Sequence, residues 1–341
     1  REGTVPELFA RFLHAYGSPN YNVMPAAADA ESLGVFVSQG NSGPLGYDLE
    51  YAKMVISFGS GYIDGWGSPS RMMMAFGGWR SNSKRDRTKI IQVETRGSLS
   101  ASKADEWVAV APGTETALAL GLAHVIVSEG RYDRTFVGQY THGFDEFRRL
   151  LRRSYTPEEV AAITGVEKEK IIGLAREFAG TKPAVALSGW GQGRMQGSMY
   201  DFLAVQSLNA LVGSLHKPGG VTRRPKPPLA PWPKVVLDAE SLTGANEPRL
   251  DGSKGSQFPL PTQLFHNLVK NIKEGNPYPA EMLWVYEANP AHDLADVQPF
   301  LEALDKIGTV VSFSSFMDDT TQLADLVLPG PTYLERLEDV H

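Results

Sequence analysis

Residues 183–220 read PAVALSGWGQGRMQGSMYDFLAVQSLNALVGSLHKPGG. They begin with a short apolar run, Ala184 to Leu187, whose length and composition are typical of a buried parallel strand. Further on, Phe202, Val205, Leu208 and Leu211 recur at helical spacing until Gly213. Between the two lie the glycines Gly189, Gly191, Gly193 and Gly197. The stretch therefore predicts a strand, a glycine turn and a helix, the building unit of α/β folds.

Two functions are open for this glycine turn. A strand, a glycine turn and a helix bring backbone N–H groups close to a phosphate, because glycine lets the backbone approach and a helix N-terminus carries partial positive charge. The alternative is a tight turn that binds no ligand. The glycine spacing does not reproduce G-x-G-x-x-G, and no acidic residue follows about 20 residues later, as in the dinucleotide fingerprint. The residues alone leave both interpretations open.

The composition is typical of a packed globular protein. The chain has 341 residues, of which 42% are hydrophobic and 21% charged, and this length suggests roughly two domains. The net charge of −6 gives no reason to expect nucleic acid as a partner. No apolar run reaches the length of about 18 residues that a membrane-spanning helix needs. The absence of cysteine excludes disulfides and Cys-ligated zinc or iron–sulfur sites in this chain.

Strand and helix patterns alternate along the chain. Further strands are predicted over 53–58, 88–93, 107–110, 282–286 and 309–313, each ending in a polar or glycine turn. Helices are expected over 4–16, 71–76, 114–127, 157–164, 167–178 and 297–304. The helix at 157 begins with a capping box at Thr156 and Glu159. Residues 21–47 are turn-rich, and 221–262 form a proline-rich excursion.

This order predicts a parallel α/β architecture. We expect the end of a preceding α/β segment at 1–20, a first α/β domain at 21–190 and a second at 191–336 that contains the excursion. Because the sequence begins with Arg1 rather than methionine, we also expect a piece of a longer polypeptide.

The ends of the predicted strands are the expected ligand sites, because parallel sheets bind ligands at their carboxyl ends. Glu94 lies where such folds place a ribose-binding carboxylate, and the alternative is a solvated loop carboxylate. The strand ends form two expected groups: 57–61 with 94–98, and 188–197 with 287–290 and 316–321. The sequence thus favours two nucleotide-like half-sites.

Eight motifs follow one another in a characteristic order. They are SFGSGYIDGW (57–66), VETRGSLSASKADEWVAVAPGTE (93–115), LALGLAHVIVSEGRYDRTFVGQYTHGF (118–144), YTPEEVAAITGV (155–166), SGWGQGRMQG (188–197), LNALVGSLHKPGG (208–220), VYEANPAHDLAD (285–296) and FMDDTTQLADLVLPGPTYLER (316–336). In this order the chain, apart from 221–262, resembles the molybdopterin oxidoreductases of the DMSO reductase superfamily. The likeness extends to polysulfide reductase-like proteins and to the molybdopterin-like subunits of quinone reductase complexes and alternative complex III.

The resemblance implies two intertwined α/β domains, the central part of a larger four-domain fold. Each would bind one guanine dinucleotide arm of a bis(molybdopterin guanine dinucleotide) cofactor. The first arm is assigned to Gly59 and Ser60, with Glu94 and Arg96 at its ribose or phosphates and Glu115, usually Asp in the family, facing guanine. The second arm is assigned to Gly191, Gly193, Asn289, Pro290, Thr320 and Thr321. An iron–sulfur cluster is expected only outside this chain.

The expected metal ligand departs from the family pattern. Many members place a Cys, selenocysteine, Ser or Asp ligand shortly after the segment that matches Gly17 to Asn20. Here that position falls on Ala28, which cannot ligate a metal. The adjacent Asp29 is the candidate ligand, and the alternative is an ordinary loop residue. Three histidines, His124, His142 and His292, are candidate acids or bases, but we interpret them as helix or loop histidines.

Two functions follow from the resemblance. The first is a subunit with a degenerate metal site in a membrane-associated, quinone-linked respiratory complex. Its expected partners are an iron–sulfur subunit and a membrane-anchor subunit, and its expected location is the periplasmic side of the membrane. The second is an active molybdenum or tungsten enzyme that performs two-electron chemistry on a small inorganic or organic substrate.

Overall fold

The computed structural model describes residues 3–41, 44–81, 87–189, 198–224, 228, 230–259, 261–332 and 334–337. The chain divides into two compact units: residues 26–226, and residues 1–25 together with 227–341. This division differs from the boundary expected after residue 190. Strand β5 (Ala184–Ser188) pairs with strand β2 (Met54–Phe58), and helix α10 (Ser198–Leu211) packs against β5. Helix α10 therefore stays with the sheet that precedes it.

The unit formed by residues 26–226 is built on a four-stranded sheet. Its order is β4 (Glu106–Ala109), β3 (Lys89–Glu94), β2 and β5. Every pairing is parallel, with Phe58 level with both Val93 and Ser188. The predicted strands and their parallel arrangement are confirmed. Because the strands are parallel and in register, Phe58, Glu94 and Ser188 end at the same edge of the sheet.

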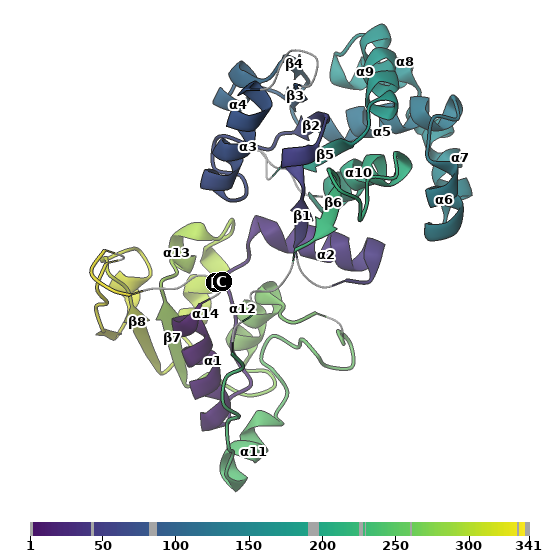
Figure 1. The fold of residues 1–341 in the computed structure, drawn as a ribbon. Helices are drawn as coiled ribbons and strands as arrows, with labels where there is room; N and C mark the ends of the chain where they lie inside the picture. Colours follow the sequence, from purple (N-terminus) through teal and green to yellow (C-terminus); the bar gives the residue numbers. More distant parts are fainter. Residues whose placement is uncertain are drawn as a thin grey trace. The chain divides into compact units, whose positions relative to one another are not determined.

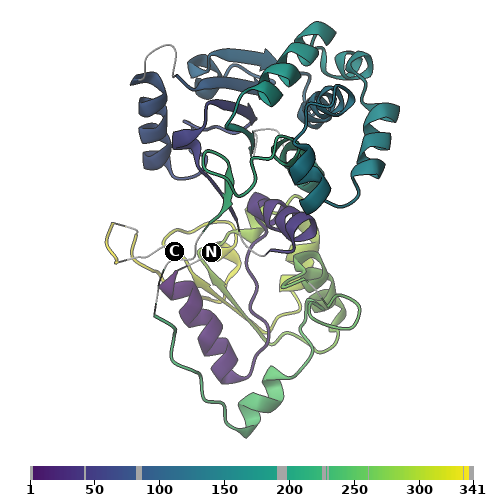
Figure 2. The ribbon, with the colours of Figure 1, turned by 45° about the vertical axis from the view of Figure 1, so that its right-hand side comes forward.

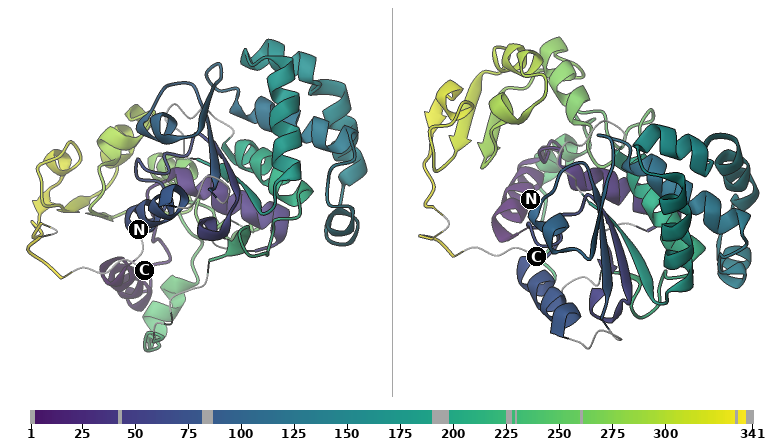
Figure 3. Two further views of the ribbon diagram at one scale, coloured as in Figure 1. Left: turned by 45° about the horizontal axis from the view of Figure 1, so that its top comes forward. Right: turned by 90° about the horizontal axis from the view of Figure 1, so that it is seen from above.

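Helices cover both faces of this sheet (Figures 1 and 3). On one face lie α3 (Pro69–Ser81) and α4 (Leu99–Lys103), and on the other lie α5 (Glu115–Ser128), α9 (Lys168–Gly180) and α10. Side chains alternate between the faces, so Ile56 joins the cluster of α5 and α9, whereas Val55 joins that of α3. Buried on both sides, the strands need the continuous apolar runs that made them recognisable in the sequence.

Three further helices of this unit extend the α5 side of the sheet. They are α6 (Arg134–Tyr140), α7 (Phe144–Ser154) and α8 (Pro157–Thr164). The predicted capping box is confirmed: Glu159 N donates to Thr156 Oγ1 at 3.3 Å, and Thr156 N donates to Glu159 Oε2 at 3.0 Å. The unit also contains a short antiparallel pair, β1 (Leu45–Tyr47) and β6 (Val221–Arg223), and a 3₁₀ turn, η1 (Leu49–Tyr51).

Helix α2 (Ala27–Gln39) corrects the expectation that residues 21–47 are turn-rich. It packs on α10 so closely that a Cβ atom at Gly34 would lie 2.4 Å from the ring of Phe202. Leu33, Phe36 and Val37 are exposed, whereas Val35 is buried, so apolar residues lie all round the helix. The sequence therefore lacked the one-sided periodicity that indicates an amphipathic helix.

The other unit has a three-stranded parallel sheet of β7 (Met282–Tyr286), β8 (Thr309–Phe313) and β9 (Leu326–Val327). Helix α1 (Thr4–Tyr16) lies along one face (Figure 2), where Phe9 contacts the rings of Trp284, Tyr286 and Phe313. A separate cluster joins α12 (Phe265–Glu274) to α14 (Gln298–Leu304) through Val269, Ile272, Phe300 and Ala303. The unit also contains α11 (Ala239–Ala245), α13 (Pro290–Asp293) and η2 (Thr321–Leu323).

The excursion 221–262 contains α11 and a buried ion pair. Arg249 bonds to Asp251 at 3.0 Å and also donates to the carbonyl oxygen of Tyr21 at 3.0 Å. This contact fixes the segment that follows α1 to the excursion. Among the described residues, no helix is long and apolar enough to cross a membrane.

Candidate functional site

A hollow of about 220 Å³ opens at the carboxyl edge of the four-stranded sheet. It lies where β2 and β3 end and where α5 begins. The residues that line it are Gly59, Gly61, Asp64, Glu94, Thr95, Arg96, Ser98, Pro112, Gly113 and Glu115. Four of the residues assigned to the first nucleotide arm, Gly59, Glu94, Arg96 and Glu115, are therefore brought together. Their contact with a ligand stays a prediction.

The loop after β2 is shaped by glycine. Gly59 has a φ of 65°, in the left-handed region that L side chains rarely adopt, and its N–H donates to Val93 O at 2.8 Å. Ser60 is fully buried, and its hydroxyl lies 2.5 Å from that of Ser57, so it does not line the hollow. At Gly59 and Gly61 the loop thus presents its backbone to the hollow.

Glu94 ends β3 with both carboxylate oxygens engaged. Oε1 accepts a hydrogen bond from Ser98 N at 3.0 Å, and Oε2 accepts one from the Gln92 side chain at 2.9 Å. A carboxylate has about four acceptor sites, so accepting capacity is left for a ligand. The sequence did not single out Gln92, because it lies inside an otherwise apolar strand.

The side chains of Arg96 and Glu115 differ from that of Glu94 in lacking a partner among the described residues. Neither side chain makes a hydrogen bond or ion pair within the part of the chain that the structure describes. Glu115 is the first residue of α5, where the partial positive charge of the helix N-terminus stabilises a carboxylate. Arg96 is exposed at the mouth of the hollow.

Asp64 is a lining residue that the sequence analysis missed. Its Oδ2 accepts hydrogen bonds from Ser100 N at 3.0 Å and Ser100 Oγ at 2.7 Å. With Glu94 and Glu115 it makes the lining of the hollow acidic, since Arg96 is the one cation among the lining residues. Carboxylates accept hydrogen bonds from N–H and O–H groups. This arrangement suits the base or ribose of a nucleotide better than a bare phosphate.

The second group of predicted residues lies in the other unit, at the carboxyl ends of β7 and β8. Asn289 Oδ1 accepts hydrogen bonds from Thr320 N at 3.0 Å and Thr320 Oγ1 at 2.7 Å. Thr321 Oγ1 lies 2.8 Å from Ser312 Oγ. Pro290, Thr320 and Thr321 are all buried. The structure brings these residues together, but their side chains stabilise the loops, and their assignment to a second arm stays a prediction.

Other assigned residues have different surroundings. Gly191 and Gly193 lie outside the described residues. Strand β5, whose end was grouped with 287–290, instead belongs to the sheet of β2. Asp29 sits in the first turn of α2, where its Oδ2 accepts a hydrogen bond from Ala26 N at 2.9 Å. This backbone contact is typical of a helix cap, and Ala28 precedes it in the same turn.

The candidate acid–base and metal residues do not form a site. His124 Nδ1 lies 3.0 Å from Leu151 O, and His292 pairs with Asp293 at 3.3 Å. Neither His124 nor His292 lines the hollow, and nor does His142. Within the described ranges, no group of His, Asp or Glu is arranged to bind a metal ion.

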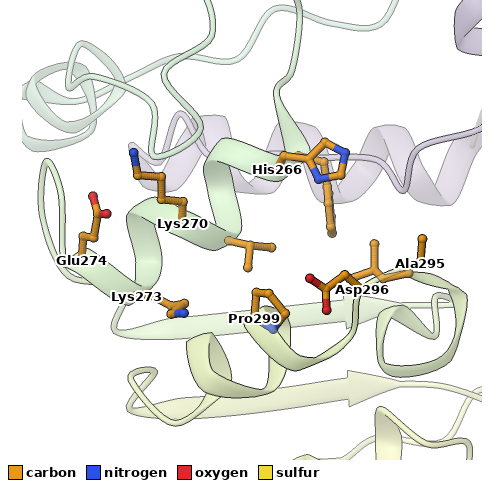
Figure 4. A pocket seen from close by; sticks show the side chains of 10 residues that line it. His266, Lys270, Lys273, Glu274, Ala295, Asp296 and Pro299 are labelled. Carbon is orange, nitrogen blue, oxygen red and sulfur yellow. The ribbon is translucent and has the colours of Figure 1, made fainter. Parts of the chain in front are cut away.

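A second hollow, of about 350 Å³, lies between α12 and the segment 294–299. Its floor is apolar, with Phe265, Val269 and Leu294. Figure 4 shows Asp296 facing this floor from one side, while the amino end of Lys270 points away from it. Because its rim mixes cations with carboxylates, this hollow favours no single ligand charge.

The model of one protein family, described as molybdopterin oxidoreductase, matches residues 6–339. The chain belongs to the molybdopterin oxidoreductase family. The α/β fold and the parallel sheets agree with this membership. A solved structure, acetylene hydratase from Pelobacter acetylenicus, superposes with a TM-score of 0.71 at 23% identity and covers 98% of this chain and 48% of the hydratase. At this identity the superposition supports the shared fold alone.

Two curated relatives in the molybdopterin oxidoreductase family align along almost the whole chain. The "Menaquinone reductase, molybdopterin-binding-like subunit" of Nitratidesulfovibrio vulgaris is 30% identical over 341 residues, covering 99% of this chain and 45% of the relative. The molybdopterin-containing subunit of the arsenate respiratory reductase of a Shewanella species is 26% identical, and the alignment covers 96% of this chain and 42% of that relative. The chain thus spans about half the length of the curated relatives it matches.

Proposed function

We propose that this chain is the cofactor-binding part of a molybdopterin oxidoreductase-like subunit in a quinone-linked, membrane-associated respiratory complex. The observation that carries the proposal is the 30% identity, over 99% of the chain, to the molybdopterin-binding-like subunit of a menaquinone reductase. In the proposed complex the chain works with an iron–sulfur subunit and a membrane-anchor subunit on the periplasmic side of the membrane.

The hollow at the ends of β2 and β3 supports a role in binding one guanine nucleotide arm of the family's cofactor. Glycine at position 59 permits the left-handed backbone beside the hollow. The carboxylate of Glu94 can accept hydrogen bonds from ribose hydroxyls, and that of Glu115 can accept them from guanine N–H groups. The residues present therefore fit the nucleoside end of such a cofactor, and the cofactor itself supplies two-electron chemistry when bound.

The proposed metal site is degenerate. Alanine occupies position 28, where the family pattern places the ligand, and its side chain offers no donor atom. Asp29 already uses one carboxylate oxygen for the backbone of Ala26. We therefore assign Asp29 to the start of α2 rather than to a metal.

An active molybdenum or tungsten enzyme is the second candidate. It is favoured by the similarity to the arsenate respiratory reductase subunit and to a thiosulfate reductase subunit of Salmonella typhimurium, the latter 25% identical over 352 residues. The exposed position of Asp29 also supports it, since an exposed carboxylate can exchange its hydrogen bond for a metal. In this case Asp29 is the protein ligand and the substrate is a small inorganic or organic molecule.

Molybdenum, tungsten and released GMP per mole of purified full-length protein separate the two candidates. Nucleotide without metal, at about two GMP for a bis-nucleotide cofactor, supports a binding subunit with a degenerate metal site. About one metal with two GMP contradicts the degenerate site and favours the enzyme. If the protein contains neither metal nor GMP, the proposal that it binds the cofactor is overturned.

A further inference from the structure

Gln92 is a buried polar residue in the middle of the four-stranded sheet. It lies inside β3, between Ile91 and Val93, and its side chain is 0% exposed. In the pairing of β2 with β3 it stands level with Ser57, and by strand alternation it shares a face with Ile90. A buried strand of a parallel sheet is normally apolar throughout. An amide at this position therefore needs a physical reason.

The amide of Gln92 joins the loop after β2 to Glu94, which lines the hollow. Its Nε2 donates to the backbone oxygen of Ser60 at 3.1 Å and to Glu94 Oε2 at 2.9 Å. The opposite orientation of the amide would place its oxygen against both of these acceptors, so the orientation is fixed by chemistry. One side chain thus links the loop after β2 to the carboxylate that ends β3.

The other end of the same amide is unsatisfied. Among buried side-chain nitrogen and oxygen atoms in the described residues, Gln92 Oε1 is the one without a hydrogen-bond partner. A buried polar atom without a partner opposes folding, and an apolar side chain of the same shape removes this cost. The unsatisfied oxygen offsets the two hydrogen bonds that Nε2 donates, so the amide brings little net stability over methionine or leucine.

We propose that Gln92 is a positioning residue that holds the Glu94 carboxylate toward the ribose of a bound guanine nucleotide. The inference rests on the proposed nucleotide-binding function. Gln92 fixes one carboxylate oxygen and Ser98 N fixes the other, so the plane of the carboxylate is set before the ligand arrives. Holding the carboxylate in advance lowers the entropy cost of binding. The remaining acceptor sites of Glu94 then receive the ribose hydroxyls.

The test measures discrimination between GDP and 2′,3′-dideoxy-GDP, which lacks the ribose hydroxyls. The full-length protein is purified from cells that cannot make the pterin cofactor, and affinities are measured by calorimetry. We expect the wild type to prefer GDP by about tenfold or more, the size of a hydrogen bond to a charged group. For Gln92→Met we expect the preference to fall to about twofold, with an unchanged or higher Tm.

Gln206→Met is the matched control. Gln206 is also buried in this unit, but both ends of its amide are engaged: Nε2 donates to Tyr47 OH at 3.0 Å and Oε1 accepts from Asn209 at 3.1 Å. It does not line the hollow. We expect Gln206→Met to lower the Tm and to leave the preference for GDP unchanged. Glu94→Ala should abolish the preference, and adding Gln92→Met to it should change nothing more.

Each outcome decides something. If Gln92→Met lowers the Tm and keeps the tenfold preference, Gln92 is a structural residue and the inference is overturned while nucleotide binding stands. If the wild type binds both nucleotides equally, Glu94 does not contact the ribose and the inference fails. If the wild type binds neither, the proposed nucleotide site fails as well. Gln92→Leu provides a second apolar variant, with the same expectations, should the methionine variant not fold.

Discussion

A Cβ atom at Gly189 would lie 2.1 Å from the backbone nitrogen of Ser60. The N–H of Gly189 also donates to Phe58 O at 3.0 Å, so the ends of β5 and β2 meet backbone to backbone. The loop that borders the hollow therefore requires a residue without a side chain at Gly189, directly after β5.

Gly189→Ala should displace the Gly59–Ser60 loop. Because both contacting groups are backbone, we expect overpacking to lower the free energy of unfolding by about 1–3 kcal/mol and to weaken GDP binding. Urea denaturation and calorimetry measure the two effects. Gly173→Ala is the control, since Gly173 lies within α9 with no atom within 4 Å of its Cβ position. It should raise stability by about 0.4–1 kcal/mol. A Gly189→Ala protein as stable as the wild type would contradict the close packing.

Glu115 should determine the preference for guanine. Its carboxylate can accept hydrogen bonds from guanine N1–H and from the exocyclic amine, which inosine lacks. We expect the wild type to bind GDP about tenfold more tightly than IDP, and Glu115→Gln to reduce this preference to about twofold. Glu158→Gln removes a carboxylate from the first turn of another helix, α8, and should leave the preference unchanged. An undiminished preference in Glu115→Gln would show that guanine is not recognised here.

The parallel strands could be predicted from the sequence because burial on both faces requires unbroken apolar runs. Strands β7 and β8 have the bounds expected for them, β2 and β5 differ by one residue at one end, and β3 is shifted by one residue. Helix α2 could not be predicted, because its apolar residues do not follow one side. The unit boundary could not either: only the pairing of β5 with β2 shows that α10 packs on the first sheet.

The candidate site was predictable only in part. The rule that ligands bind at the ends of parallel strands, together with the family resemblance, grouped Gly59, Glu94 and Glu115. Side-chain partners are not encoded in such patterns. Thr320 lies at the expected edge of its sheet, yet its hydroxyl donates to Asn289. Gln92 lies within an apolar run, so the sequence did not show that its side chain bonds to Glu94. Asp64 is brought to the hollow by the turn after Gly61, and the motif at 57–66 that contains it does not indicate which of its side chains face a ligand.

Asp29 should behave as a helix-capping residue. Asp29→Ala removes the acceptor for Ala26 N and a negative charge from the first turn of α2, which should cost about 0.5–1 kcal/mol in the free energy of unfolding. Asp29→Asn keeps an acceptor and should cost less. Neither variant should alter the molybdenum, tungsten or GMP content of the full-length protein. Loss of metal in both variants would instead identify Asp29 as a ligand.

The Arg249–Asp251 pair should make stability depend on pH below 4. Burial raises the pKa of Asp251, but hydrogen bonds from Arg249, Ser253 and the backbone of Leu264 outweigh it and lower the pKa to about 2. The unfolded value is about 3.9. The folded state therefore binds this proton less readily, and the resulting stability is complete above about pH 4 and lost as the pH falls toward 2. The difference corresponds to roughly 2–3 kcal/mol.

Asp251→Asn should remove this part of the pH dependence and leave the buried guanidinium of Arg249 without its counter-charge. The Arg249 side chain is only 12% exposed. We therefore expect Asp251→Asn to lower the free energy of unfolding by about 3–5 kcal/mol at neutral pH. Thermal unfolding between pH 2 and pH 7 measures both effects. Glu302→Gln removes an exposed carboxylate that pairs with Lys273 in the same unit, and it should change little because solvent screens the pair. If the Tm of Asp251→Asn falls as steeply between pH 4 and pH 2 as that of the wild type, other carboxylates cause the acid sensitivity.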